Sequence, residues 1–334
     1  MNINKSSFAF RIVTIIFFCL SYSVGAKAQT YNPLLLARDY TPKTIDLTVK
    51  DNARKREIPI RVYMPDIKSK SPVVLFSHGL GGSREGSAFL GKHWAVRGYV
   101  AVFLQHPGSD ESVWKDKKPT ERMNAMKQAA STQNFLLRVK DVSVVLDQLE
   151  IWNKTNGNVL EGMIDMNHIG MSGHSFGALT TQAVSGQNIA RANISMSDPR
   201  IKAAVIMSPS SPKVGVDPKQ SFGSVKIPWL LMTGTKDVSA IGDADLESRL
   251  AVYPALPNGG KYELVLFRAE HSVFTERALP GDTERRNPNH HKSILALSTA
   301  FWDAYLKNDT KAKTWLNGGG PYTVLEANDK WQKK

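Results

Sequence analysis

Short apolar segments alternate along the chain with longer stretches whose apolar positions recur near helical spacing. The first kind predicts buried strands and the second predicts helices. We expect strands at residues 44–49, 57–64, 72–77, 99–105, 168–172, 201–207, 229–233 and 263–267, and helices at 85–97, 134–152, from 178 onward and at 294–306. Strands that alternate with helices form a mostly parallel sheet covered on both faces. The pattern therefore predicts one doubly wound α/β domain.

Residues 107–133 form the longest weakly patterned stretch. They are mostly polar but include Trp114, Met123 and Met126. Two interpretations stay open: a cap insertion that lines an apolar pocket, or ordinary packing of these side chains.

The first 28 residues do not continue this pattern. Lys5 and Arg11 accompany an apolar run at 12–20, which is too short to span a bilayer. Residues 26–28 read Ala-Lys-Ala, the small-x-small pattern of a signal-peptidase site. We expect cleavage after Ala28, one α/β domain from 29 to 334, and export to the periplasm or the exterior. An uncleaved anchor helix is the alternative.

Composition narrows the class of protein. The 334 residues are 42% apolar and 22% charged, as in globular proteins. Cys19 is the only cysteine and lies within residues 1–28, so the mature chain would have no disulfide and no cysteine metal site. The net charge of +13 favours anionic surfaces or substrates. The basic clusters at 54–56 and 115–118 come without a nucleic-acid motif, so we interpret them as a basic surface.

A Gly-x-Ser-x-Gly motif follows the expected strand at 168–172. It reads GHSFG at residues 173–177, and a helical run begins at Ala178. A strand, a tight turn and a helix are the context of a nucleophile elbow, in which the serine is strained and the glycines avoid clashes. We expect Ser175 to be a nucleophile whose helix aims amide groups at a developing oxyanion. A structural glycine-rich turn is the alternative.

A second glycine-rich loop, HGLGG at residues 78–82, follows the expected strand at 72–77. With such an elbow, this loop donates one backbone N–H to the oxyanion and the residue after the nucleophile donates the other. We expect the amides of Leu80 and Phe176 to be these donors. We interpret His78 as a residue that braces the loop.

The acid and the base follow the nucleophile in the chain order Ser, acid, His. Asp237 comes just past the expected strand at 229–233, at the sheet edge where sites form. We expect Asp237 to be the acid, and Asp243, Asp245 and Asp217 stay open as alternatives.

His271 follows the last expected strand, 263–267, and we expect it to be the base that takes the Ser175 proton. His174 is expected to point away from the reacting oxygen. We interpret His290 and His291 as surface residues in a polar loop. The remaining group of neighbouring histidines lacks metal-site spacing, so we expect neither metal nor cofactor: His78, His93 and His106.

The stretch from 77 to 109, together with GHSFG, resembles the platelet-activating-factor acetylhydrolase group and the bacterial dienelactone-hydrolase-like proteins, over about residues 31–310. The resemblance implies an α/β-hydrolase fold, hydrolysis of short acyl esters without a cofactor, and Leu80 and Phe176 as oxyanion donors. Dienelactone hydrolases carry a cysteine where Ser175 stands. The animal acetylhydrolases place their acid where residues 206–210 have none, which supports Asp237 and argues against carrying over phospholipid specificity.

We therefore expect an exported carboxylic-ester hydrolase that works through a Ser-His-Asp triad and an acyl-enzyme. A peptidase or amidase with the same triad is the second hypothesis, and a non-catalytic binding protein on this fold is the third. We expect a monomer that takes a small-molecule or lipid-like ester, with no nucleic-acid partner and no stable membrane span.

Overall fold

The computed structural model describes most of the chain beyond Thr30. The described residues are 1, 31–36, 41–67, 69–189, 194–212, 217–242, 244–279 and 281–334. Met1–Thr30 and Tyr31–Lys334 are separate units, and only the second is discussed. The expected signal peptide, including Cys19, lies outside the described residues except for Met1.

The described residues form a nine-stranded sheet in the order β1-β2-β4-β3-β5-β8-β9-β10-β11. The six central strands from β4 to β10 run parallel, and β1, β2 and β11 are antiparallel to their neighbours. The strands are β1 Lys43–Asp51, β2 Arg56–Met64, β3 Ser71–Ser77, β4 Val100–Leu104, β5 Ile164–His174, β8 Ile201–Met207, β9 Trp229–Lys236, β10 Lys261–Glu270 and β11 Lys330–Lys333; a small hairpin joins β6 Asn188–Ile189 to β7 Ile194–Ser195.

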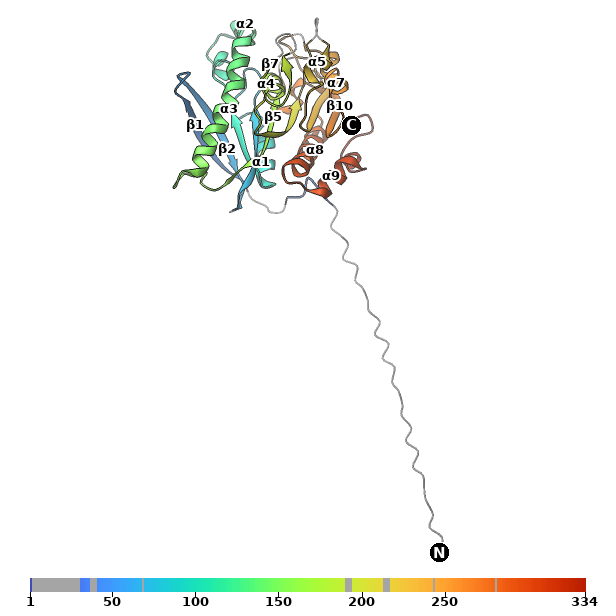
Figure 1. The fold of residues 1–334 in the computed structure, drawn as a ribbon. Helices are drawn as coiled ribbons and strands as arrows, with labels where there is room; N and C mark the ends of the chain where they lie inside the picture. The colour runs from blue at the N-terminus through green and yellow to red at the C-terminus, as the bar shows by residue number, and fades with distance from the viewer. Residues whose placement is uncertain are drawn as a thin grey trace. The chain divides into compact units, whose positions relative to one another are not determined.

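Helices cover both faces of the sheet, as Figure 1 shows. One face carries α1, α8 and α9, and the other carries α3, α4, α5 and α7. The helices are α1 Ala88–Val96, α2 Pro119–Ala129, α3 Thr132–Lys154, α4 Phe176–Val184, α5 Pro218–Phe222, α6 Leu246–Leu250, α7 Val252–Ala255, α8 Pro288–Leu306 and α9 Thr310–Asn317, with short 3₁₀ turns at Glu111–Val113, His271–Phe274 and Pro321–Thr323.

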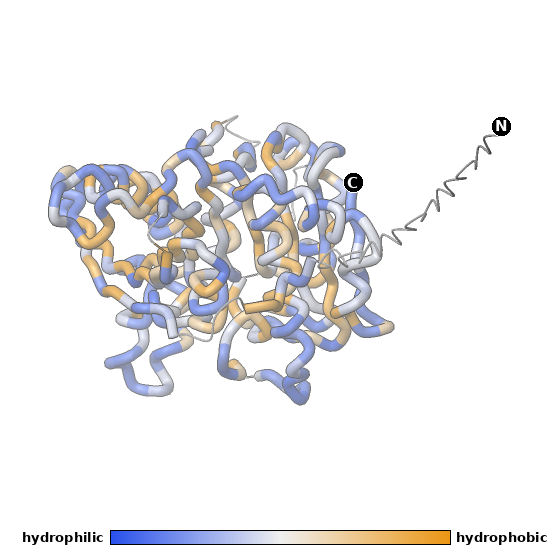
Figure 2. Tube along the Cα trace, turned by 90° about the horizontal axis from the view of Figure 1, so that it is seen from below, coloured by the Kyte–Doolittle hydropathy of each residue, from blue (hydrophilic) through white to orange (hydrophobic). Residues whose placement is uncertain are grey.

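Consecutive strand residues divide between two cores because side chains alternate across a sheet. Val73 and Leu75 of β3 join the cluster under α3, whereas Val74 and Phe76 join the cluster under α1 and α8. A strand buried on both faces has no polar side, which explains the continuously apolar runs in the sequence. Figure 2 shows the hydrophobic positions gathered along the interior strands and the hydrophilic positions on the outer loops.

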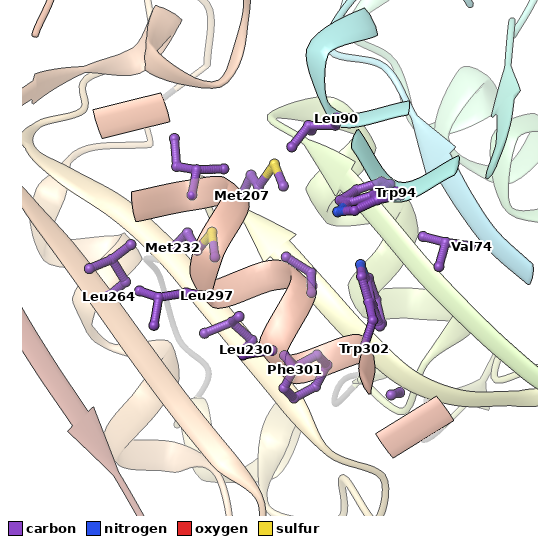
Figure 3. Packing of buried hydrophobic residues seen from close by; sticks show 14 of the residues in the cluster. Val74, Leu90, Trp94, Met207, Leu230, Met232, Leu264, Leu297, Phe301 and Trp302 are labelled. Atoms are coloured by element: carbon purple, nitrogen blue, oxygen red, sulfur yellow. The ribbon is translucent and has the colours of Figure 1, made fainter. Parts of the chain in front are cut away.

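Helix α8 packs against the strand that leads to the elbow. Trp302 of α8 is fully buried and meets Trp94 of α1 edge to face, with 6.0 Å between the ring centroids (Figure 3). A Cβ added at Gly170 of β5 would lie 2.7 Å from the Trp302 ring. Gly170 thus lets the helix approach the central strand closely.

The predicted α/β fold is confirmed, and every expected strand overlaps an observed one. The prediction for His290 and His291 was wrong: they are not in a surface loop, because α8 begins at Pro288. His290 is buried and lies 3.1 Å from the Phe267 carbonyl oxygen, and the half-buried His291 stacks on Phe89. The capping residue Asn287 followed by a proline at the first helical position is the sequence signal for this start.

We expect Trp302→Ala to lower the free energy of unfolding by about 3–5 kcal/mol, the usual cost of emptying a packed core position. Equilibrium urea unfolding followed by circular dichroism measures the loss. Phe267→Ala is the control, because Phe267 is 42% exposed and its truncation should cost less than about 1 kcal/mol. Equal losses for the two variants would contradict this packing.

Candidate active site

Ser175 occupies a strained turn between β5 and α4. Its φ of 58° and ψ of −117° lie in a region of backbone conformation that residues with a side chain rarely adopt. The Ser175 amide donates to the Met207 carbonyl at 3.0 Å, which ties the turn to the end of β8. Strain of this kind persists only where the surroundings hold it, and it is characteristic of functional sites.

The two glycines of the motif are required by close approaches, as expected. A Cβ at Gly177 would lie 1.9 Å from the Ser77 carbonyl oxygen, and one at Gly173 would lie 2.3 Å from the Gly177 carbonyl oxygen. Neither contact is available to a residue with a side chain. The turn can therefore be built only with glycine on both sides of Ser175.

The structure brings Ser175, His271 and Asp237 into one hydrogen-bonded chain. Ser175 Oγ lies 2.8 Å from His271 Nε2, and His271 Nδ1 lies 2.6 Å from Asp237 Oδ1. The three residues follow β5, β10 and β9, whose parallel carboxyl ends meet at one edge of the sheet. A carboxylate at Nδ1 places the imidazole proton there and leaves Nε2 free to accept the serine proton.

Asp237 is fully buried and its carboxylate is surrounded by donors. Ser208 Oγ and Thr233 Oγ1 donate to Oδ2 at 2.7 and 2.9 Å, and Arg249 Nε lies 3.0 Å from Oδ1. Burial alone raises the pKa of Asp237, but the hydrogen bond from His271 and the nearby positive charge hold that pKa well below its usual range. The carboxylate thus stays ionised beside the histidine.

Arg249 of α6 fixes the chain segments around the acid. Its guanidinium is buried and donates to the carbonyl oxygens of Asp237, Ser208 and Pro209 at 2.7–3.1 Å. Its Nη2 also lies 3.2 Å from His271 Nδ1. Because the Nδ1 proton points to Asp237, this last approach is a contact between two donors rather than a hydrogen bond.

The rival acids are placed elsewhere or lie outside the described residues. Asp245 caps α6 by accepting from the Ser248 amide at 2.9 Å, and Asp217 caps α5 by accepting from the Lys219 amide at 2.9 Å. Asp243 falls on an undescribed position. Of the described candidates, Asp237 alone bonds to His271.

The loop at residues 78–82 runs directly beside Ser175. A Cβ at Gly79 would lie 3.4 Å from the Ser175 Cβ. The amides of Leu80 and Phe176 donate to no acceptor within the described part of the chain. Both expected oxyanion donors are thus unbonded amides on segments that flank the serine. Fixed backbone donors suit a developing charge because they need no reorganisation.

His174 packs against the imidazole of His271. Its ring centroid lies 4.7 Å from that of His271 and 5.4 Å from that of Phe274. Burial holds the pKa of His174 well below its usual range, so the ring is neutral. His174 therefore packs against the base and takes no place in the Ser175–His271–Asp237 chain.

Residues 107–133 contact the loop at 78–82. Trp114 Nε1 donates to the Gly81 carbonyl at 2.7 Å, and a Cβ at Gly81 would lie 2.5 Å from Met126 Sδ. Met123 is 47% exposed. Two of the three apolar side chains thus pack onto the loop that carries the Leu80 amide.

Sequence reasoning missed three groups that hold the acid: Ser208, Thr233 and Arg249. Ser208 lies in the segment that lacks an acidic residue, and it supplies a hydroxyl to Asp237 instead. A left-handed φ of 61° at Ser208 is a second strained position at this edge. No local pattern marks Arg249, because its partners lie 12 to 41 positions earlier in the chain.

Residues 62–208 match the family described as platelet-activating factor acetylhydrolase, isoform II. The matched range covers the loop at 78–82 and the elbow, whereas Asp237 and His271 lie beyond it. This family belongs to the α/β-hydrolase superfamily, and the described residues have a fold consistent with it, a mostly parallel sheet with helices on both faces. A comparison with curated proteins gives no match. The family match supports ester hydrolysis as the class of activity of this hydrolase.

The described helices include none that is long and apolar enough to cross a membrane. Within the described ranges, no three His, Cys, Asp or Glu side chains are grouped to hold a metal ion. His78 and His106 instead make hydrogen bonds within the protein.

We expect Gly177→Ala to lower kcat/KM of the hydrolase on a chromogenic ester by about 100-fold or more, because the new methyl group forces the turn off the Ser77 carbonyl. Steady-state kinetics and thermal unfolding measure activity and folding together. Gly319→Ala is the matched control, because a Cβ there meets nothing within 4 Å. Unchanged activity of folded Gly177→Ala would show that the turn tolerates the shift.

Proposed function

We propose that this hydrolase is a serine esterase that cleaves carboxylic esters with short acyl chains. The observation that carries the proposal is the continuous chain from Ser175 through His271 to Asp237 on a strained elbow. The family similarity, which concerns an acetylhydrolase, supports a small acyl group. Trp114 and Met126 contact Gly81, the residue after Leu80, and we propose that they lie beside the acyl group.

In the acylation step, Ser175 Oγ gives its proton to His271 Nε2 and attacks the ester carbonyl carbon. The carbonyl oxygen becomes negative and is held by the amides of Leu80 and Phe176. When the tetrahedral intermediate collapses, the bond to the alcohol oxygen breaks and that oxygen takes the proton from His271. The acyl group remains on Ser175.

In the deacylation step, His271 takes a proton from water, and the hydroxide attacks the acyl carbon. The bond to Ser175 Oγ breaks, Ser175 recovers the proton from His271, and the acid leaves. Asp237 remains ionised throughout and stabilises each imidazolium that forms. Its depressed pKa is what this task requires.

We further propose that the protein acts as a monomer after export, on a small-molecule or lipid-like ester. The leader-like residues 1–28 support export. We expect mass spectrometry of the exported protein recovered from its host to find Gln29 as the first residue. A chain that lacks residues 1–28 should have the same activity as this exported protein.

We expect the hydrolase to cleave p-nitrophenyl acetate faster than the butyrate and octanoate esters, and to leave a peptide p-nitroanilide intact. Ser175→Ala should lose kcat by about 10⁶-fold, as when a triad serine is removed. Steady-state kinetics on this panel measures both results. Full activity in Ser175→Ala would remove the nucleophile assignment, and faster cleavage of the anilide would favour a peptidase or amidase.

Asp237→Asn should lower kcat by about 10⁴-fold, because an amide cannot hold the Nδ1 proton of His271 in the required tautomer. Asp245→Asn is the matched control, since asparagine caps a helix as well as aspartate does, and its kcat should stay within about twofold. The same panel of esters measures the two variants. The reverse outcome, a large loss only in Asp245→Asn, would assign the acid to α6.

A further inference from the structure

A buried arginine lies behind the oxyanion loop. Arg138 of α3 is 0% exposed, and its Nη2 donates to the His78 carbonyl at 2.8 Å while its Nε donates to Ser109 Oγ at 2.9 Å. Burial lowers the pKa of Arg138 to about 9, so the guanidinium keeps its charge at neutral pH. Burying a charged group is energetically unfavourable unless the group is hydrogen-bonded. These hydrogen bonds therefore fix the position of the Arg138 side chain.

Arg138 also contacts the elbow. Its guanidinium carbon lies 4.5 Å from the centre of the Phe176 ring, in the geometry of a cation over an aromatic face. Phe176 supplies one expected oxyanion amide, and His78 begins the loop that supplies the other. One side chain thus touches both halves of the oxyanion hole without reaching Ser175 itself.

The side chain of His78 also stabilises the loop at residues 78–82 that Arg138 contacts. His78 Nε2 accepts the His106 amide at 3.1 Å, so the ring proton sits on Nδ1, which donates to the Gly79 carbonyl at 2.6 Å. Arg138 Nη2 also lies 3.0 Å from this Nδ1, but two donors do not bond. Arg138 therefore holds the loop through the His78 carbonyl.

The other side of the loop is tied to Ser109. The Ser109 carbonyl accepts the Gly81 amide at 2.9 Å, and its hydroxyl accepts from Arg138. Arg138 thus reaches the residues on each side of Leu80: directly to His78 and through Ser109 to Gly81. The position of the Leu80 amide between them follows from these two attachments.

A second, fully buried Ser-His-Asp chain anchors this region one turn further along α3. Ser77 Oγ lies 3.0 Å from His106 Nε2, and His106 Nδ1 lies 2.9 Å from Asp141 Oδ2. Burial raises the pKa of Asp141, but hydrogen bonds from His106 and Arg56 outweigh it and lower that pKa to about 2. With no access to substrate, this chain is structural.

The same carboxylate corrects the interpretation of the basic cluster at 54–56. Arg54 Nη2 and Arg56 Nε both donate to Asp141 Oδ1 at 2.8 Å, so these two side chains turn inward and do not form a free basic surface. They hold Asp141 from the β2 side. Asp141 in turn fixes the part of α3 from which Arg138 extends.

We propose that Arg138 is a positioning residue that sets the distance between the Leu80 and Phe176 amides across the oxyanion hole. The proposal rests on the serine-esterase function above and deepens it. Displacing a donor by about 1 Å reduces the stabilisation of the transition state far more than the binding of the ester, because the oxyanion forms only in the transition state. The effect of Arg138 should therefore fall on kcat rather than on KM.

Arg138→Lys keeps the charge but cannot bond to His78 and Ser109 with two nitrogens and stack on Phe176 at once. We expect kcat on p-nitrophenyl acetate to fall about 10- to 100-fold, below the cost of removing a donor outright, with KM within about twofold. The kcat of Arg138→Met should be lower still. Circular dichroism and thermal unfolding establish the folded fraction of each variant.

Arg97→Lys is the matched control. Arg97 is a largely buried arginine bonded to the buried Asp303, so its replacement perturbs another buried arginine, in a part of the fold that makes no contact with Ser175. Its kcat should stay near the wild-type value. An unchanged kcat in folded Arg138→Lys would overturn the proposal. A decrease in kcat that is fully explained by a smaller folded fraction, in Arg138→Lys as in Arg97→Lys, would also overturn it.

Ser109→Ala tests the same link with a change that a folded protein tolerates. It removes the hydroxyl that accepts from Arg138 but keeps the carbonyl that holds Gly81. We expect kcat to fall about threefold to tenfold, and the effects of Ser109→Ala and Arg138→Lys to be less than multiplicative in the double variant. Multiplicative effects would mean that the two residues act separately, against the proposal.

Failure of this inference differs from failure of the proposed function. If the wild type cleaves the ester and Ser175→Ala does not, the esterase assignment holds whatever Arg138 does. If Ser175→Ala cleaves it as well as the wild type, the esterase assignment falls first. Only a normal kcat in folded Arg138 variants of an active, Ser175-dependent enzyme rejects the positioning role by itself.

Discussion

The strained turn at Ser175 is the constraint on which the site depends. A left-handed φ at a residue with a side chain is unfavourable, and here it is kept by the Met207 carbonyl on one side and the Ser77 carbonyl beside Gly177 on the other. Both carbonyls belong to the strands that flank β5. The exposed serine is thus a consequence of how closely three central strands and α4 pack.

Two buried carboxylates organise the space around this turn. Asp237 is held by His271, Ser208, Thr233 and Arg249, while Asp141 is held by His106, Arg54 and Arg56. Each is stable as an anion because donors replace the water it has lost. The first carboxylate is linked to the reacting serine through His271, and the second is linked through His106 to Ser77, which precedes the loop that would hold the oxyanion. Fixed charges therefore support both sides of Ser175.

The alternating pattern and the glycine motifs were sufficient to predict the elbow, the residues that form its hydrogen-bonded chain and every strand of the main sheet except the edge strand β11. These follow from local rules: strands read as apolar runs, and site residues follow strand ends. Arg249 and Arg138 could not be predicted, because their partners are distant in sequence and an arginine in a helix is usually exposed. The start of α8 was missed although Asn287 and Pro288 carry its signal.

In the proposed mechanism, Ser175 becomes covalently acylated during turnover. Mass spectrometry of the protein quenched in acid during turnover of p-nitrophenyl acetate tests it directly. We expect at most one acetyl group per chain, on the peptide that contains Ser175. The acetylated fraction should rise when His271 is replaced, if deacylation then slows more than acylation by this activated ester. An acetyl group on another residue, or active enzyme that never carries one under any quench, would contradict the account.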